Sequence, residues 1–173
     1  DLTFTQQTTP ITKLIIIFFF FAIVDGPIGE EIGWRGFLLP RLLNSHGPLT
    51  ASLLLGLVWF AWHVPLYLAT GRVEMTVAFF ASYALNNVAF SFLHTWFFLR
   101  SKGSAFLAIV LHTSGNYAVY LAVTLLPGLE QAPFTQPLYV GMLVVAAVIA
   151  GASMRRGGPG MTLGSEAEDV RHV

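Results

Sequence analysis

Five long hydrophobic segments, separated by short polar connections, constrain this chain more than any other feature. A helix that crosses a bilayer needs about 20 mostly apolar residues. The first such segment begins near Ile11 and continues past Asp25 and Pro27 into residues 30–39. The other four cover residues 48–68, 75–99, 104–126 and 137–154. We therefore expect an all-α fold, a polytopic membrane helix bundle with about five transmembrane helices.

Composition supports a membrane protein. The mean hydropathy is +0.68 and 10% of the residues are charged, whereas soluble domains carry roughly 25% charged residues. The net charge of zero gives no reason to expect a nucleic-acid partner. The absence of cysteine excludes disulfides and thiolate metal sites. The alternative, a set of buried helices in a large soluble core, is disfavoured by five segments of spanning length.

Charged residues between the segments predict an orientation. Alternating spans place one group of basic residues on a single side: Arg41, Arg100, Lys102, Arg155 and Arg156. The opposite side receives a mixed group: Lys13, Arg72, Glu74 and Glu130. By the positive-inside rule the C-terminus is cytoplasmic. We expect an integral membrane protein, with a bacterial plasma membrane as its location and membrane lipids as its surroundings.

Two regions are expected along the chain. Residues 11–154 form the transmembrane domain, and residues 155–173 form a polar, Gly-rich, flexible C-terminal tail. The chain begins at Asp1 rather than Met, so we expect a fragment or a processed form that lacks N-terminal helices.

Ionisable side chains inside a membrane span are costly and usually mark a site or a pairing. In this chain they are Asp25, Glu30, Glu31, Arg35, His63, His94 and His112.

The first cluster is Glu30-Glu31 followed by Arg35. On a helix Glu31 and Arg35 are four residues apart and can form an ion pair. Glu30 lies about 100° round the helix from Glu31 and lacks that partner, so it is suited to take a proton from water as a general base. The alternative is a charged patch at the membrane surface.

Two further clusters contain histidine. His63 follows Trp59 by one turn in the second segment, where the alternative role is a core histidine bonded to a carbonyl. His112 and Asn116 share one face of the fourth segment, and hydrogen-bond donors aimed at one point stabilise the oxyanion of peptide hydrolysis. The alternative for this pair is an interhelical hydrogen bond.

The depth of these residues suggests a shared site. At ~1.5 Å per residue from the cytoplasmic ends, Glu30, His63 and His112 lie roughly 10–25 Å into the membrane. One Glu and two His can bind zinc, or Glu30 can activate water without a metal; both schemes stay open. His94 lacks a matching partner pattern, so we predict a structural role for it. Asp25 is expected to mark a break in the first helix.

Together the three clusters resemble the CPBP family, the group of CAAX prenyl proteases and bacteriocin-processing (Abi) membrane proteins. The family pattern is EExxxR, then FxxxH, then HxxxN on successive helices. It is matched in order by Glu30-Glu31…Arg35, Trp59…His63 and His112…Asn116, and the resemblance covers about residues 15–155. One departure is Trp59, where the family usually has Phe; we expect this to affect cavity shape more than chemistry.

The resemblance implies an intramembrane endopeptidase. Glu30 would be the water-activating carboxylate and His63 its helper, while His112 and Asn116 would stabilise the oxyanion. A metal, if used, would be held by Glu30, His63 and His112, and Glu31 with Arg35 would support the first motif. The implied partner is a peptide or protein substrate, either prenylated or bacteriocin-like.

Two alternative functions stay open from the sequence. A non-catalytic relative with an immunity or scaffolding role would keep its function after Glu30→Gln or His112→Ala. A proton-coupled transporter would give proton-coupled flux without cleaved peptide, although the chain shows no inverted repeat of the kind found in many transporters.

Overall fold

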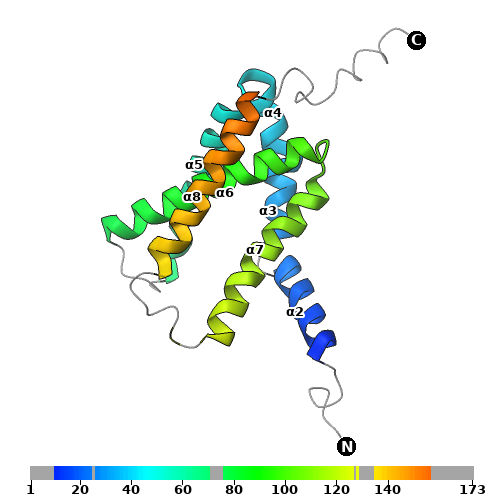
Figure 1. Cartoon of the computed structure of the whole chain (residues 1–173), viewed down its shortest axis with the longest axis vertical. Helices are drawn as coiled ribbons and strands as arrows, with labels where there is room; N and C mark the ends of the chain where they lie inside the picture. Colours follow the sequence, from blue (N-terminus) through cyan, green and yellow to red (C-terminus); the bar gives the residue numbers. More distant parts are fainter. Residues whose placement is uncertain (1–9, 25, 71–75, 127, 129–134, 157–173) are drawn as a thin grey trace, which may run out of the picture.

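The computed structural model describes residues 10–24, 26–70, 76–126, 128 and 135–156, and every element in these ranges is helical. The elements are α2 (Pro10–Val24), α3 (Pro27–Gly33), the π-helical turn η1 (Trp34–Leu38), α4 (Leu39–Ser45), α5 (Pro48–Thr70), α6 (Val77–Arg100), α7 (Ala105–Leu125) and α8 (Thr135–Arg156). The prediction of an all-α helix bundle is confirmed, and the long helices occupy the five expected segments (Figure 1).

Within the described ranges, three helices are long and apolar enough to cross a membrane: Pro48–Thr70, Ala105–Ala122 and Pro137–Arg155. A fourth span arises if Ile11–Ile23 and Pro27–Ser45, which are bent by 41° relative to each other, are counted together. The remaining helix, α6, has 24 residues but is not among them. Buried polar residues such as Asn87, Ser91 and Thr95 lower its hydropathy and suit it to the interior of the bundle.

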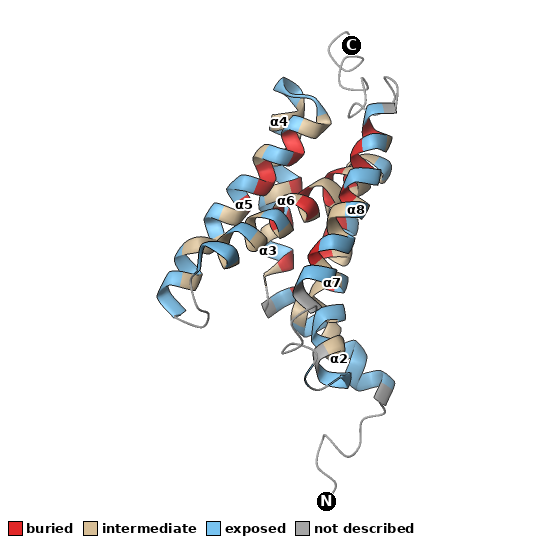
Figure 2. Cartoon of the chain, turned by 60° about the vertical axis from the view of Figure 1, so that its left-hand side comes forward, coloured by how far each residue is buried: buried red, intermediate tan, exposed pale blue. Residues whose placement is uncertain are grey.

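Large apolar side chains cover the outside of the helices. Phe106, Leu125 and Val77 are 70%, 71% and 86% exposed, respectively. Buried residues instead concentrate where the helices meet, and the outer faces are mostly exposed (Figure 2). An apolar exterior around a polar interior is the arrangement of an integral membrane protein.

Local sequence explains how the first segment is divided. Gly26 has a φ of 99°, a conformation that costs glycine little, and Pro27 then occupies the first turn of α3. The predicted break at Asp25 lies outside the described residues. Farther along, Thr76 and Ser104 cap α6 and α7 by accepting hydrogen bonds from the backbone N–H groups of Phe79 and Leu107.

Helix α6 lies at the centre of the bundle and packs against α5, α7 and α8. Its close contact with α5 depends on Gly56, because a Cβ atom there would lie 2.7 Å from the Cα of Val88. The two backbones can therefore approach only with glycine at this position.

Three segments that carry basic residues lie toward one end of the molecule. In Figure 1, α4, the turn between α6 and α7, and the end of α8 are all in the upper part. Arg100 at the end of α6 donates a hydrogen bond to Ser153 of α8 at 3.0 Å, which links two of these ends. Residues Arg72, Glu74, Glu130 and the tail 157–173 lie outside the described part of the chain.

We predict that Gly56→Ala lowers the free energy of unfolding by about 1–3 kcal/mol, because the backbone of α6 cannot yield to the added methyl group. Thermal unfolding in detergent would measure this. Gly141→Ala on α8 is the matched control, since a Cβ atom there meets nothing within 4 Å. Equal melting temperatures for the two variants would contradict the prediction.

Candidate active site

The two consecutive glutamates of α3 occupy different environments. Glu31 is fully buried, and its Oε1 lies 2.9 Å from Nη1 of Arg35, which is also fully buried. The predicted ion pair is therefore confirmed. Glu30, one residue earlier, is only partly buried and lines a large cavity. Glu31 neutralises a buried cation, and Glu30 remains available to a molecule inside the cavity.

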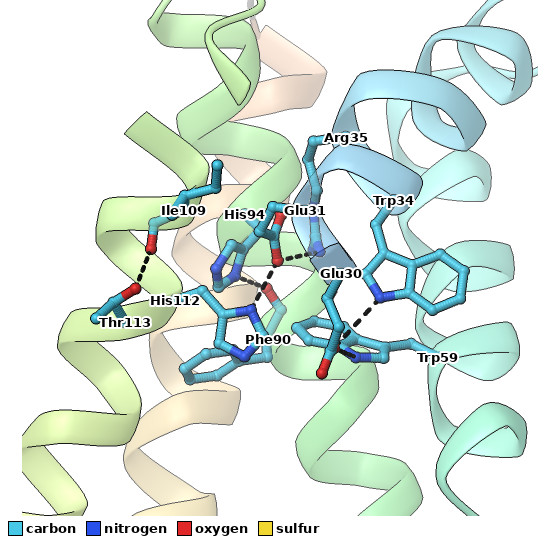
Figure 3. A network of polar contacts seen from close by, with 10 residues as sticks. All are labelled: Glu30, Glu31, Trp34, Arg35, Trp59, Phe90, His94, Ile109, His112 and Thr113. Atoms are coloured by element: carbon cyan, nitrogen blue, oxygen red, sulfur yellow. Dashed lines mark hydrogen bonds and ion pairs between the residues drawn. The ribbon is translucent and has the colours of Figure 1, made fainter. Parts of the chain in front are cut away.

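The Glu31 carboxylate also orients a histidine from a distant helix. His112 of α7 has its Nδ1 atom 2.9 Å from Glu31 Oε1, so one oxygen accepts from both Arg35 and His112 (Figure 3). A carboxylate only accepts, so the proton of this bond resides on Nδ1. The Nε2 atom is then the one left for other partners. His112 is 5% exposed and lines the same cavity as Glu30.

The Glu30 carboxylate is held by two indole groups. Its Oε2 accepts a hydrogen bond of 2.6 Å from Nε1 of Trp59 and a longer one of 3.4 Å from Nε1 of Trp34. Its Oε1 lies over Gly26, where a Cβ atom would be 2.8 Å from this oxygen. The glycine, which is needed for the turn before α3, also makes room for the carboxylate.

The cavity brings the predicted site residues together. It has a volume of about 870 Å³ and a wall built from α2, α3, α5, α6, α7 and α8. Its lining includes four of the predicted site residues: Glu30, His63, His112 and Asn116. Aromatic rings and the amides of Asn86 and Asn87 complete much of the wall. Polar groups on a largely apolar wall are typical of a ligand or active site.

His63 combines the two roles considered for it. Its Nδ1 atom lies 2.9 Å from the carbonyl oxygen of Trp59 in the preceding turn, which is the carbonyl bond of the structural alternative. A carbonyl can only accept, so Nδ1 carries the proton and Nε2 is free of that bond. Because His63 also lines the cavity, the backbone bond fixes the orientation of a ring that a substrate can reach.

His94 lies closer to the buried network than the sequence indicated. It is 1% exposed, and its Nδ1 atom donates to the carbonyl oxygen of Phe90 at 2.9 Å. One ligand atom from each of His94, Glu31 and His112 lies within 4.8 Å of the others. The structural role predicted for His94 overlooked this grouping. The spacing Phe90…His94 repeats the FxxxH pattern literally and was the signal that could have identified it.

The cluster Glu31, His94 and His112 differs from the metal set proposed from sequence. Among the described residues it is this group, and not Glu30, His63 and His112, that meets the distance requirement for a metal. The donor types suit zinc, and His94 Nε2 and Glu31 Oε2 are buried without a hydrogen-bond partner. All three residues are at least nine-tenths buried, so the cluster fits a closed site better than an open catalytic one.

We predict that Arg35→Met lowers the free energy of unfolding by roughly 3–5 kcal/mol, because it leaves the buried Glu31 carboxylate without its counter-charge. Chemical or thermal unfolding in detergent would measure the change. Arg41→Met is the matched control, since Arg41 is exposed and donates a hydrogen bond to the carbonyl oxygen of Phe37 one turn earlier. A loss no larger than that of Arg41→Met would contradict the prediction.

Comparison with known proteins gives two matches. Residues 12–118 match the family described as Rce1-like, type II CAAX prenyl endopeptidase Rce1-like. The chain is also similar to CAAX prenyl protease 2 of Methanococcus maripaludis, with 28% identity over 88 residues that cover 48% of this chain. The aligned part spans 32% of that relative's length. No solved structure matches the chain.

Proposed function

Because the chain belongs to the Rce1-like family of type II CAAX prenyl endopeptidases, we propose that it hydrolyses peptide bonds inside the membrane, with Glu30 as the residue that activates water. The observation that carries this proposal is the cavity of about 870 Å³ lined by Glu30, His63, His112 and Asn116. A carboxylate, two imidazoles and an amide on one cavity wall supply a base and hydrogen-bond donors for amide hydrolysis.

The proposed reaction begins with a water molecule beside Glu30. The carboxylate takes a proton from this water, whose oxygen bonds to the scissile carbonyl carbon and forms an oxyanion. His112 and Asn116 donate hydrogen bonds to that oxygen. When the C–N bond breaks, the leaving amine takes the proton from Glu30. His63 assists by orienting the water through its cavity-facing ring.

The buried network supports the proposed role of His112. Its Nδ1 atom already donates to Glu31, so donation from Nε2 to an oxyanion requires the imidazolium form of the ring. The adjacent Glu31 carboxylate is positioned to stabilise this positive charge. Glu31 therefore acts as a positioning residue, in keeping with the supporting role that the resemblance implies for it.

The proposed substrate is the C-terminal peptide of a prenylated CAAX protein, with a bacteriocin-like peptide as the second class. The apolar and aromatic part of the cavity wall suits a lipidated peptide. We further propose that residues 11–154 form the protease domain, that residues 155–173 are a separate tail, and that the C-terminus is cytoplasmic in a bacterial plasma membrane. The grouping of basic ends supports this orientation.

A metal-dependent form is the second candidate, favoured by the cluster of Glu31, His94 and His112. Glu31, His94 and His112 would hold a zinc ion there, and in so closed a site the ion would fix the ring of His112 and add positive charge beside it. The nearby Arg35, 2.9 Å from Glu31, already supplies positive charge to this carboxylate and weighs toward the metal-free scheme.

We predict that Glu30→Gln lowers kcat for cleavage by about 10²–10⁴-fold, because the amide cannot take a proton from water. The assay uses the purified protein in detergent with a prenylated CAAX peptide and, separately, a bacteriocin-like peptide. Glu130→Gln, the same charge-neutralising change between two hydrophobic segments of the sequence, is the matched control. Cleavage by Glu30→Gln at the rate of this control would reject the proposed role of Glu30, and unchanged cleavage by His112→Ala would reject that of His112. A wild-type protein that cleaves neither peptide would favour the non-catalytic relative.

The metal-free scheme predicts that cleavage survives exhaustive chelation. Metal analysis of the purified protein, before and after dialysis against a chelator, would be compared with peptide cleavage by the same samples. Parallel loss of bound zinc and activity, restored together when zinc is returned, would instead establish the metal-dependent form. His94→Ala would then remove the metal as well, whereas His46→Ala at an exposed position would not.

A further inference from the structure

The indole of Trp59 joins the cavity to the buried ion pair. We propose that Trp59 is a positioning residue that holds the Glu30 carboxylate through its N–H group and links it to the charge of Arg35. This inference rests on the proposed function, in which Glu30 activates water. It assigns chemistry to a residue that the sequence suggested would affect the shape of the cavity more than the chemistry.

The hydrogen bond between Trp59 and Glu30 is the first observation. The Nε1 to Oε2 distance of 2.6 Å is shorter than the ~2.9 Å usual for N–H···O bonds. Trp59 is 3% exposed, so its indole is largely shielded from water. Since Oε2 accepts from the indoles, Oε1 is the oxygen of Glu30 that we expect to receive the proton from water.

The second observation is the position of Arg35. Its Cζ atom lies 4.7 Å from the centroid of the Trp59 ring, a cation–π contact. A cation over the ring draws electron density toward its face and makes the N–H group a stronger donor. Arg35 is in turn held by Glu31 at 2.9 Å. The contacts thus run from the carboxylate of Glu31 to the cation of Arg35, and from there through the indole of Trp59 to the carboxylate of Glu30.

Ring contacts fix the orientation of the indole. Its centroid lies 5.2 Å from that of His112 and 5.8 Å from that of His94, both edge-on. The ring therefore cannot turn its N–H group away from Glu30 without disturbing these histidines. Phenylalanine, which the family pattern usually has here, is a smaller aromatic ring and would lack the N–H donor. In this chain the substitution adds a restraint on the catalytic carboxylate.

The test compares Trp59→Phe with Trp96→Phe. Trp96 is a close control because its indole also donates a hydrogen bond, to Ser153 at 3.3 Å, and also has an arginine, Arg100, over its ring at 5.7 Å. It lies outside the cavity wall. We expect Trp59→Phe to lower kcat by about 10- to 100-fold, with KM changed by less than about 3-fold, while Trp96→Phe changes neither.

A spectroscopic measurement tests the same contact without any substrate. The chain has four tryptophans, so ¹⁵N-labelled indoles give four N–H signals that the Trp→Phe variants assign. In the whole protein in detergent, we expect the Trp59 signal to be downfield and to move in Glu30→Gln, while the Trp96 signal stays in place. This measurement remains informative if Trp59→Phe fails to fold, because the other three Trp→Phe variants then assign the Trp59 signal by elimination.

The two measurements separate failure of this inference from failure of the proposed function. A Trp59 signal that does not respond to Glu30→Gln, or a kcat for Trp59→Phe equal to that of Trp96→Phe, would overturn the positioning role. A wild-type protein that cleaves no peptide, but whose Trp59 signal still responds to Glu30→Gln, would overturn the proposed protease function and support the Trp59–Glu30 contact.

Discussion

The buried Glu31 carboxylate organises the interior of this protein. A single oxygen accepts from Arg35 on the same helical segment and from His112 on α7, both at 2.9 Å. In an apolar interior each of these charges would be costly alone, and their pairing makes the burial tolerable. Because the Nδ1 atom of His112 is bonded to Glu31, the opposite edge of the ring is oriented toward the cavity before any substrate arrives. The cation of Arg35 then supports the indole of Trp59, which holds Glu30 (Figure 3).

This arrangement explains why two adjacent carboxylates are needed. Neighbouring residues on a helix point about 100° apart, so one can face the packed interior while the other faces the cavity. Glu31 is fully buried and bonded to Arg35 and His112, whereas Glu30 accepts from neutral indole donors and has access to the cavity. The same short motif thus provides a fixed counter-charge and, under the proposed function, a base as well.

Contacts within one helix could be predicted from the sequence, and contacts between helices could not. The Glu31–Arg35 pair followed from a spacing of four residues, and the structure confirms it. The grouping of His94 with Glu31 and His112 was not predicted, because these neighbours come from α3 and α7 and the Phe90…His94 spacing alone does not show which residues the ring meets. The Trp59–Glu30 bond joins residues 29 positions apart for the same reason. The catalytic roles assigned to Glu30, His63, His112 and Asn116 stay predictions.

The π-helical turn η1 allows Glu31 and Leu39, at the two ends of one segment, to face the interior together. Glu31 and Leu39 are both fully buried, although they are eight residues apart and would point about 80° away from each other on a regular α-helix. The π-helical turn contains one residue more than an α-helical turn. The two side chains are therefore oriented as if they were seven residues apart on a regular helix, and their directions differ by only about 20°. Leu39 packs with Leu55 and Phe98 in the apolar core. The same inward-facing side of this segment can therefore place an ionic residue, Glu31, at one end and an apolar core residue, Leu39, at the other.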